Sequence, residues 1–235
     1  MGGMSQSFTD KLAARIKETG SALCVGLDPR PGMDDLEAIP ALLRKVVEET
    51  APYAAAFKPN IAYFEAMGLR GLEILEDLLP DMPKDVPVVL DAKRGDIGET
   101  QKYYAHAYFE RLGVDAVTLS SADVERQELA GGRRVFELVG DMVLRSVREG
   151  CKTSVGMVVG LTNADSSILE RIPDAPLLIP GLGAQGGDLS CLSGSGHVAP
   201  PLINVSRGIM YQNPELGFAE KAAGFAQRIR EALNY

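Results

Sequence analysis

The hydrophobic positions of this chain fall into two kinds of segment that alternate along its length. Short apolar runs without polar alternation occur seven times, and longer segments with apolar residues at helical spacing separate most of them. A run that is apolar on both faces is typical of a strand in a parallel sheet covered by helices. The predicted strands are 22–27, 54–58, 86–90, 116–120, 153–160, 176–180 and 201–205.

The longer segments predict helices between these strands. Ser7 is expected to cap the first helix and Gly20 to end it. Asn213 as cap, followed by Pro214, is expected to open the closing helix. The apolar face of each helix would pack on the sheet. The remaining predicted helices cover 35–50, 61–79, 99–112 and 122–149.

The recurring order of strand, loop and helix predicts one α/β domain over residues 1–235, with residues 1–6 as a disordered start. The length suits a single (β/α)8 barrel, the TIM barrel. A Rossmann sheet is the alternative, because Gly181, Gly183 and Gly186 form a G-x-G-x-x-G motif. This motif lies late in the chain and lacks an acidic ribose partner downstream. Polar residues at the end of strand after strand favour the barrel.

One unit of this barrel is missing from the pattern. Eight strands are expected and seven are found, and the gap follows Ser120, where a βα unit of about 30 residues should stand. Residues 134–139 could be the lost strand, but their apolar spacing continues as a helix. Either the molecule lacks the unit or the sequence omits residues that the molecule contains. Omission is favoured, because an open sheet edge beside an active site is costly. A Cα step near Ala122 much longer than about 3.8 Å would indicate it.

The candidate chemistry lies where the third predicted strand ends. Asp91, Lys93 and Asp96 follow it within six residues. In strand geometry Asp91 and Lys93 point to the same side, so a carboxylate and an ammonium would share one pocket wall. Asp28 and Lys58 stand at the ends of the two preceding strands, and the same barrel rim should collect them. The alternative is a solvated loop with surface ion pairs.

Two late loops, 180–187 and 206–208, are candidates for holding a phosphate group. In barrels this site is commonly built by the loops after the last two strands, where glycine amides can approach an anion. Ordinary turns and a surface arginine at Arg207 are the alternative. The joint occurrence of both loops in these places favours the phosphate site.

Charge and composition limit the kinds of partner that this chain is expected to bind. The net charge of −8 argues against nucleic acid and anionic membranes, so an anionic substrate would be held by a local cluster. No apolar stretch approaches a membrane span and no signal peptide is evident, so a cytoplasmic location is expected. Cys24, Cys151 and Cys191 predict neither a disulfide framework nor a zinc site. His106 and His197 are expected to be structural or solvated.

Several blocks of this sequence resemble one family, the orotidine 5'-monophosphate decarboxylases, in their bacterial branch. The segment DAKRGDIGET at 91–100 is similar to the central motif of these enzymes. Matching blocks are spread over nearly the whole chain, which makes the resemblance specific. The blocks are 23–29, 57–60, 91–100, 158–162, 180–186 and 206–208.

The resemblance implies a site as well as a fold. Lys93 would be the proton donor, working with Asp91, Asp96 and Lys58. Asp28 and Lys58 would hold the ribose hydroxyls. The residues that the resemblance implies for substrate binding are Asp28, Ile97, Thr100, Thr162, Pro180, Gln185, Ser206, Arg207 and Gly208.

The resemblance also implies the reaction and the assembly. The substrate would be orotidine 5'-monophosphate and the product uridine 5'-monophosphate, made in pyrimidine biosynthesis without cofactor or metal. Asp96, Ile97 and Thr100 would reach into the site of the other subunit of a homodimer. In the resembling enzymes the unit missing here ends in a Thr-Ser-Asn-like segment on the pyrimidine edge, and no residue of this chain can be assigned to it.

Two other functions remain open at this point. Sugar-phosphate decarboxylases and aldolases share the Asp-x-Lys-x-x-Asp barrel but need a divalent metal, so metal dependence separates them from the first hypothesis. A catalytically silent barrel that binds a phosphate ligand is the other alternative, motivated by the missing unit. Turnover of orotidine 5'-monophosphate would discriminate against it.

Overall fold

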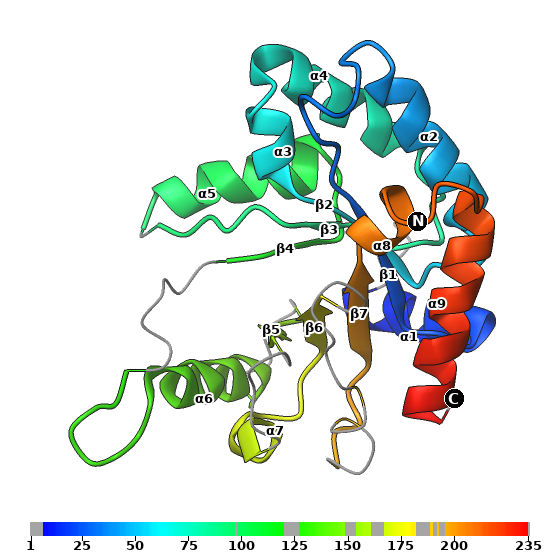
Figure 1. Ribbon diagram of the computed structural model, residues 1–235. Helices are drawn as coiled ribbons and strands as arrows, with labels where there is room; N and C mark the ends of the chain where they lie inside the picture. The colour runs from blue at the N-terminus through cyan, green and yellow to red at the C-terminus, as the bar shows by residue number, and fades with distance from the viewer. Residues whose placement is uncertain are drawn as a thin grey trace, which may run out of the picture.

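The computed structural model describes residues 7–96, 98–119, 127–148, 154–160, 167–181, 189, 192 and 196–234. Its strands are all parallel and form a curled sheet with helices around it (Figure 1). Each of the seven predicted runs overlaps one strand. The strands are β1 (Leu23–Leu27), β2 (Ala56–Pro59), β3 (Val89–Leu90), β4 (Ala116–Val117), β5 (Met157–Val158), β6 (Leu177–Pro180) and β7 (Pro201–Val205).

The sheet is built outward from β1, which is buried along its whole length. β1 pairs with β2 on one side and β7 on the other, in the register Cys24↔Ala56 and Cys24↔Asn204. Bridges between Phe57 and Val88 and between Asn60 and Asp91 join β2 to β3. The strand order is therefore β4-β3-β2-β1-β7-β6-β5.

Helices and helical turns connect the strands. Ser7 caps α1 as predicted, because its Oγ accepts the Asp10 N–H at 3.2 Å, and Gly20 ends it with a φ of +60°. Within the described residues no helix is both long and apolar enough to cross a membrane. The helices are α1 (Phe8–Thr19), α2 (Ile39–Thr50), α3 (Ile61–Glu65), α4 (Gly68–Leu78), η1 (Leu79–Asp81), α5 (Thr100–Ala105), η2 (His106–Arg111), α6 (Val135–Arg148), α7 (Ser167–Arg171), α8 (Arg207–Met210) and α9 (Phe218–Leu233).

Besides the predicted helix 35–50, which begins only at Ile39, three helix predictions were wrong in their bounds. The segment 61–79 divides into α3 and α4, because Gly68, the first residue of α4, takes a φ of +66°. The closing helix begins at Phe218 and not at Pro214, since Asn213 lies in the left-handed region with a φ of +49°. Its cap is Gly217, whose N–H donates to the Glu220 carboxylate at 2.9 Å.

The third correction concerns the segment after the gap. The helix α6 begins at Val135, and Glu128 pairs with Arg134 in a turn before it. Residues 134–139 are therefore no lost strand, because all but the first of them are helical. The helical spacing of the apolar residues outweighed the short apolar run.

The curled sheet is open between β4 and β5, and among the described residues neither outer edge pairs with another strand (Figure 1). A closed barrel would hold one more strand there, and chain order places it between residues 117 and 157. This agrees with the unit predicted to be missing after Ser120. Leu119 and Val158, which flank these edges, are 68% and 54% exposed. The step from Ser120 to Ala122 lies outside the described residues.

A matched pair of helix glycines tests the packing of α3 against α4. Gly71→Ala should destabilise the fold by about 1–3 kcal/mol, because the added Cβ would lie 2.0 Å from the Phe64 carbonyl oxygen. Gly224→Ala in α9 should stabilise it by up to about 1 kcal/mol, because a Cβ there meets nothing within 4 Å. Urea unfolding measures both. Shifts of the same sign would contradict the packing described here.

Candidate active site

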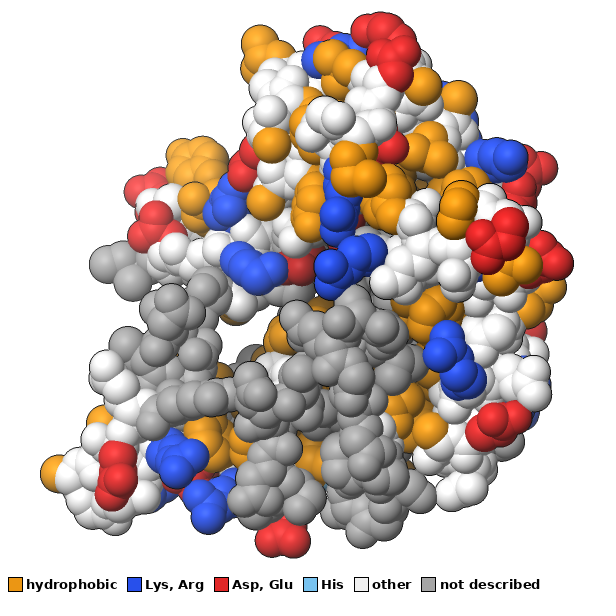
Figure 2. Space-filling model, viewed as in Figure 1, with side chains coloured by type: hydrophobic (Ala, Val, Ile, Leu, Met, Phe, Trp, Pro, Cys, Tyr) orange, Lys and Arg blue, Asp and Glu red, His pale blue; other side chains and the backbone are white. Residues whose placement is uncertain are grey.

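Parallel strands bring their carboxyl ends to one rim, and the charged residues predicted for the site meet there. Lys58 lies in β2 and Asp91 directly follows β3, and their side chains are in contact although 33 residues separate them. Figure 2 shows Lys and Arg side chains gathered near the middle of the viewed face, with acidic side chains between them. A local cluster of this kind can hold an anion on a chain of negative net charge.

Asp91 is the centre of the cluster. Its Oδ2 accepts a hydrogen bond from Lys58 Nζ at 3.0 Å, and its Oδ1 accepts one from Lys93 Nζ at 2.5 Å. The hydroxyl of Thr118 donates a third bond to Oδ1 at 2.8 Å. Three donors therefore fix the orientation of one carboxylate.

The electrostatics keep these groups charged. Burial would raise the pKa of Asp91, but the charge of Lys58 and the hydrogen bonds from Lys93, Lys58 and Thr118 outweigh it and hold the pKa below its usual range. Burial would lower the pKa of Lys58, but the charges of Asp28 and Asp91 outweigh it and raise that pKa. Lys58 and Asp91 therefore favour each other's charged form, within an array in which acidic and basic side chains alternate.

Asp28 completes the array from the end of β1. Burial raises its pKa, against the charge of Lys58 and hydrogen bonds from the Ser206 side chain and the Asn60 backbone. Its Oδ1 is buried and has no hydrogen-bond partner, and the same holds for Asn204 Oδ1 in the neighbouring strand β7. Buried acceptors without donors are costly, so a ligand hydroxyl or amide is a fitting partner for them.

The pairing of Lys93 with Asp91 has a different cause from the one predicted. Lys93 has left the strand and takes a φ of +48°, so strand alternation does not bring the two side chains together. A turn does so. Arg94 supports this turn, because its guanidinium bonds Glu65 of α3 and donates to the Ala92 carbonyl oxygen at 2.8 Å.

Asp96 lies on the segment between β3 and α5, and Thr100 is the first residue of α5. This segment runs away from the sheet and turns back where α5 begins (Figure 1). Both residues are exposed, and α5 has no buried residue. Ile97 lies outside the described residues.

The predicted phosphate loops are described in part. Pro180 ends β6 and is exposed, while Ser206, Arg207 and Gly208 follow β7. Gly208 has a packing reason for lacking a side chain, because a Cβ there would lie 2.5 Å from Phe225 Cζ. Thr162 and Gln185 lie outside the described residues.

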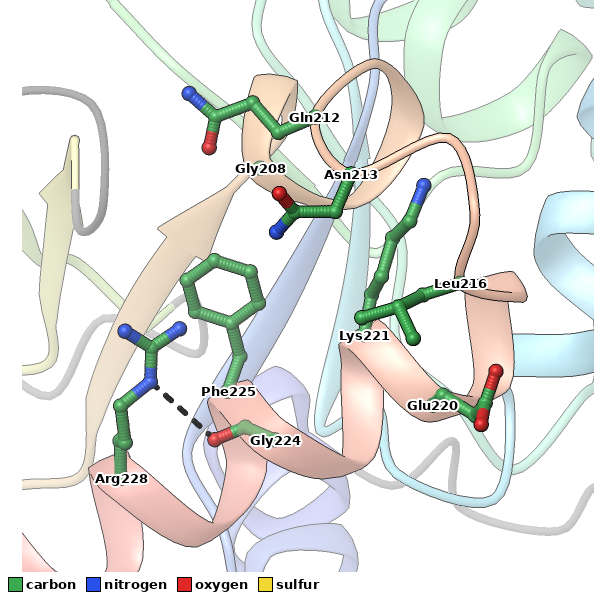
Figure 3. Close-up of a pocket in the computed structure, with 9 residues that line it drawn as sticks. All are labelled: Gly208, Gln212, Asn213, Leu216, Glu220, Lys221, Gly224, Phe225 and Arg228. Atoms are coloured by element: carbon green, nitrogen blue, oxygen red, sulfur yellow. Dashed lines mark hydrogen bonds between the residues drawn. The ribbon is translucent and has the colours of Figure 1, made fainter.

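A separate pocket of about 240 Å³ lies between α8 and α9 (Figure 3). Phe225 and Arg228 line it, and the Arg228 guanidinium lies 4.2 Å from the centre of the Phe225 ring. Of the predicted site residues only Gly208 touches this pocket. It therefore lies outside the charged array and is no candidate for the chemistry.

Two candidate site residues escaped the sequence analysis, Thr118 and Asn204. Thr118 could have been found from the pairing of β3 with β4, because Leu90 lies opposite Val117 and the next pair is Asp91 with Thr118. Asn204 gave a weaker signal, a polar residue within an apolar run. Neither stands out without knowledge of which strands are neighbours.

The histidines and the described cysteine have ordinary surroundings. His106 is exposed with its Nδ1 2.8 Å from Glu110 Oε2, and His197 Nε2 lies 3.1 Å from the Pro173 carbonyl oxygen. Cys24 is buried without a disulfide, and burial raises the pKa of its thiol to about 12. The thiol is therefore protonated and unsuited to nucleophilic chemistry.

Comparison with known proteins identifies relatives of this chain. A family model described as "Orotidine 5'-phosphate decarboxylase / HUMPS family" matches residues 21–123, the span that contains Asp28, Lys58, Asp91 and Lys93. Orotidine 5'-phosphate decarboxylase of Herpetosiphon aurantiacus is 34% identical, over 97% of this chain and 99% of that protein. The same-named protein of Cupriavidus taiwanensis is 38% identical, over 97% and 98%.

The alignment with the Herpetosiphon protein also gives a lower bound on the number of that protein's positions that this chain lacks. It spans 274 positions against 235 residues here, so at least 39 positions of that relative have no counterpart in this chain. One βα unit of a barrel is about 30 residues. The excess is large enough for the unit that the strand order lacks.

Solved structures agree with the fold. The structure of Leishmania donovani OMP decarboxylase superimposes with a TM-score of 0.81 at 31% identity, over 98% of this chain and all of that one. The open parallel sheet is thus a (β/α)8 barrel fold with one strand position unfilled among the described residues. On its sequence identity to relatives matched over nearly their whole length, the chain belongs to the orotidine 5'-phosphate decarboxylase family.

Proposed function

We propose that this protein decarboxylates orotidine 5'-monophosphate to uridine 5'-monophosphate in pyrimidine biosynthesis, without a cofactor or a metal. The observation that carries the proposal is the alternating array of Asp28, Lys58, Asp91 and Lys93 at the strand ends, in a chain of this family. Such an array suits a reaction in which negative charge grows on a carbon atom.

Loss of CO2 breaks a carbon–carbon bond and leaves its electron pair on a pyrimidine carbon with little delocalisation. A cation fixed beside that carbon stabilises the growing charge. Lys93 is suited to this role, because its side chain is 60% exposed while its Nζ is fixed by Asp91. Its ammonium then gives a proton to the carbanion and regains one from water.

Asp91 and Lys58 prepare this step. The Asp91 carboxylate would lie against the substrate carboxylate and disfavour the bound substrate relative to the transition state, in which that charge is leaving. Lys58 keeps Asp91 ionised, since its side chain is only 5% exposed and ion-paired at 3.0 Å. Lys58 with Asp28, whose buried Oδ1 lacks a donor, would hold the ribose hydroxyls.

Binding energy from the phosphate group would come from the neighbouring strand ends, those of β6 and β7. Arg207 and the backbone at Ser206 and Gly208 would hold the phosphate, and Pro180, Gln185 and Thr162 would border the phosphate and pyrimidine. Binding that is remote from the reacting carbon can be used in the transition state. These residue roles come from the family resemblance and complete the proposed site.

We further propose that the protein is a cytoplasmic homodimer with shared active sites. The support for shared sites comes from the chain that follows β3. Asp96 and Thr100 are exposed where this chain runs away from its own sheet, and Tyr103 of α5 is 68% exposed. Ile97 would act with them. An apolar ring exposed on a helix with no buried residue suits a surface that a second subunit covers.

The function is tested by following loss of the orotate absorbance with purified protein in EDTA. We expect turnover that chelation does not change. Activity that disappears with EDTA and returns with Mg2+ would move the assignment to the metal-dependent sugar-phosphate relatives. Absence of turnover would favour the silent phosphate-binding barrel.

The role of Lys93 is tested by Lys93→Ala. We expect kcat to fall far more than tenfold with the fold intact, because the ammonium acts on the transition state. Circular dichroism and steady-state kinetics measure the two effects. A variant that keeps more than about a tenth of the wild-type kcat, roughly 1.4 kcal/mol, would exclude Lys93 as the proton donor.

Shared sites are tested by mixing two inactive variants, Asp96→Ala and Lys93→Ala. Each mixed dimer would contain one whole site, so equal mixing with random exchange should restore about a quarter of wild-type activity. The matched control is Lys58→Ala mixed with Lys93→Ala, which should stay inactive because both residues belong to one chain's site. If exchange is complete and Asp96→Ala is not rescued, each site is built from one chain.

A further inference from the structure

Thr118 lies directly after β4, at a place where its backbone is tied to β3. The register Leu90↔Val117 sets Thr118 opposite Asp91, and the Thr118 N–H donates to the Leu90 carbonyl oxygen at 3.0 Å. The side chain is buried, with the residue 9% exposed. Its hydroxyl is therefore held at a constant distance from the charged array.

The hydroxyl of Thr118 makes two bonds whose directions are fixed by chemistry. The backbone N–H of Lys93 can only donate, and it does so to Thr118 Oγ1 at 3.2 Å. The ionised Asp91 carboxylate can only accept, so the Thr118 O–H donates to Asp91 Oδ1 at 2.8 Å. One hydroxyl thus joins the carboxylate of Asp91 to the backbone of Lys93.

This double contact acts on the strained part of the site. Lys93 takes a φ of +48°, a conformation that non-glycine residues adopt only when their surroundings hold it. The side chain of Lys93 is long and 60% exposed, so its ammonium depends on Asp91 and on the turn for its place. The strand β4 has two residues and, in the described part of the chain, pairs only with β3. The side-chain bonds of Thr118 therefore act beside those of Arg94 in fixing the turn.

We propose that Thr118 is a positioning residue of the active site, which holds the Asp91 carboxylate and the Lys93 turn in the arrangement that protonates the substrate carbon. The inference rests on the proposed decarboxylation. Thr118 acts through Asp91 and Lys93 and is assigned no contact with the substrate. Its removal should therefore affect the chemical step more than substrate binding.

The test compares Thr118→Val, which keeps the shape and removes the hydroxyl, with Thr118→Ser, which keeps the hydroxyl. For Thr118→Val we expect kcat to fall about 10- to 100-fold, the effect of losing one hydrogen bond to a charged group, with KM changed less than about threefold. Thr118→Ser should stay within about threefold of wild type in kcat. Thr50→Val is the matched control, because Thr50 is buried and its hydroxyl donates to the Val46 carbonyl oxygen of its own helix.

A pH readout separates positioning from general destabilisation. The Thr118 hydroxyl is one of the groups that hold the pKa of Asp91 below its usual range, so Thr118→Val should raise that pKa. The reaction needs Asp91 ionised, and the acidic limb of the kcat profile should therefore move to higher pH in Thr118→Val but not in Thr50→Val. Titration of the Asp91 carboxyl by 13C NMR should show the same upward shift without any need for turnover.

The outcomes distinguish this inference from the proposed function. One outcome is that the wild type turns over while Thr118→Val leaves kcat, the acidic limb of the pH profile and the Asp91 titration unchanged. That result would overturn the role of Thr118 and leave the decarboxylation standing. A wild-type protein without turnover would overturn both. If Thr118→Val and Thr50→Val lose kcat equally and the Asp91 titration does not shift, Thr118 only stabilises the fold.

Discussion

The buried ion pair between Lys58 and Asp91 is the interaction on which the rest of the site depends. Removing an ammonium and a carboxylate from water costs several kcal/mol per ion, and the pair recovers this only with good geometry and further hydrogen bonds. The structure supplies both, with a 3.0 Å contact and additional donors from Lys93 and Thr118. Because Lys58 belongs to β2 and Asp91 follows β3, the same pair also fixes how these two strand ends meet.

Burial decreases along the array from Asp28 to Lys93. Asp28 and Lys58 are buried, Asp91 has a side chain that is 12% exposed, and Lys93 is 60% exposed. Lys58 and Asp91 are largely shielded from water and favour each other's charged form, which gives the outer ammonium of Lys93 a fixed and charged partner. A cation placed in this way can act on charge that develops in the substrate without first reorganising its surroundings.

The open side of the sheet sets this chain apart from its relatives. The strand order ends at β4 and β5, and the relative from Herpetosiphon carries at least 39 positions that have no counterpart here. Exposed apolar side chains such as Leu119 and Val158 flank these edges. The charged array lies at the ends of β1 to β3, where β1 pairs with β2 and bridges join β2 to β3, so the described part of the site does not use the missing position.

The amino-acid pattern alone was enough to predict the parallel strands and the charged residues that follow them, because a run that is apolar on both faces leaves little choice of environment and the charges follow such runs directly. The pattern predicted helix starts less well: Asn213 favours a cap in general, but here its left-handed backbone delays α9 to Phe218.

Which charges touch one another could not be predicted in this way. The contact of Lys58 with Asp91 and the place of Thr118 depend on strand neighbours, and Lys93 meets Asp91 through a left-handed turn that strand alternation did not foresee. Such contacts arise from pairing distant segments, which no local pattern records.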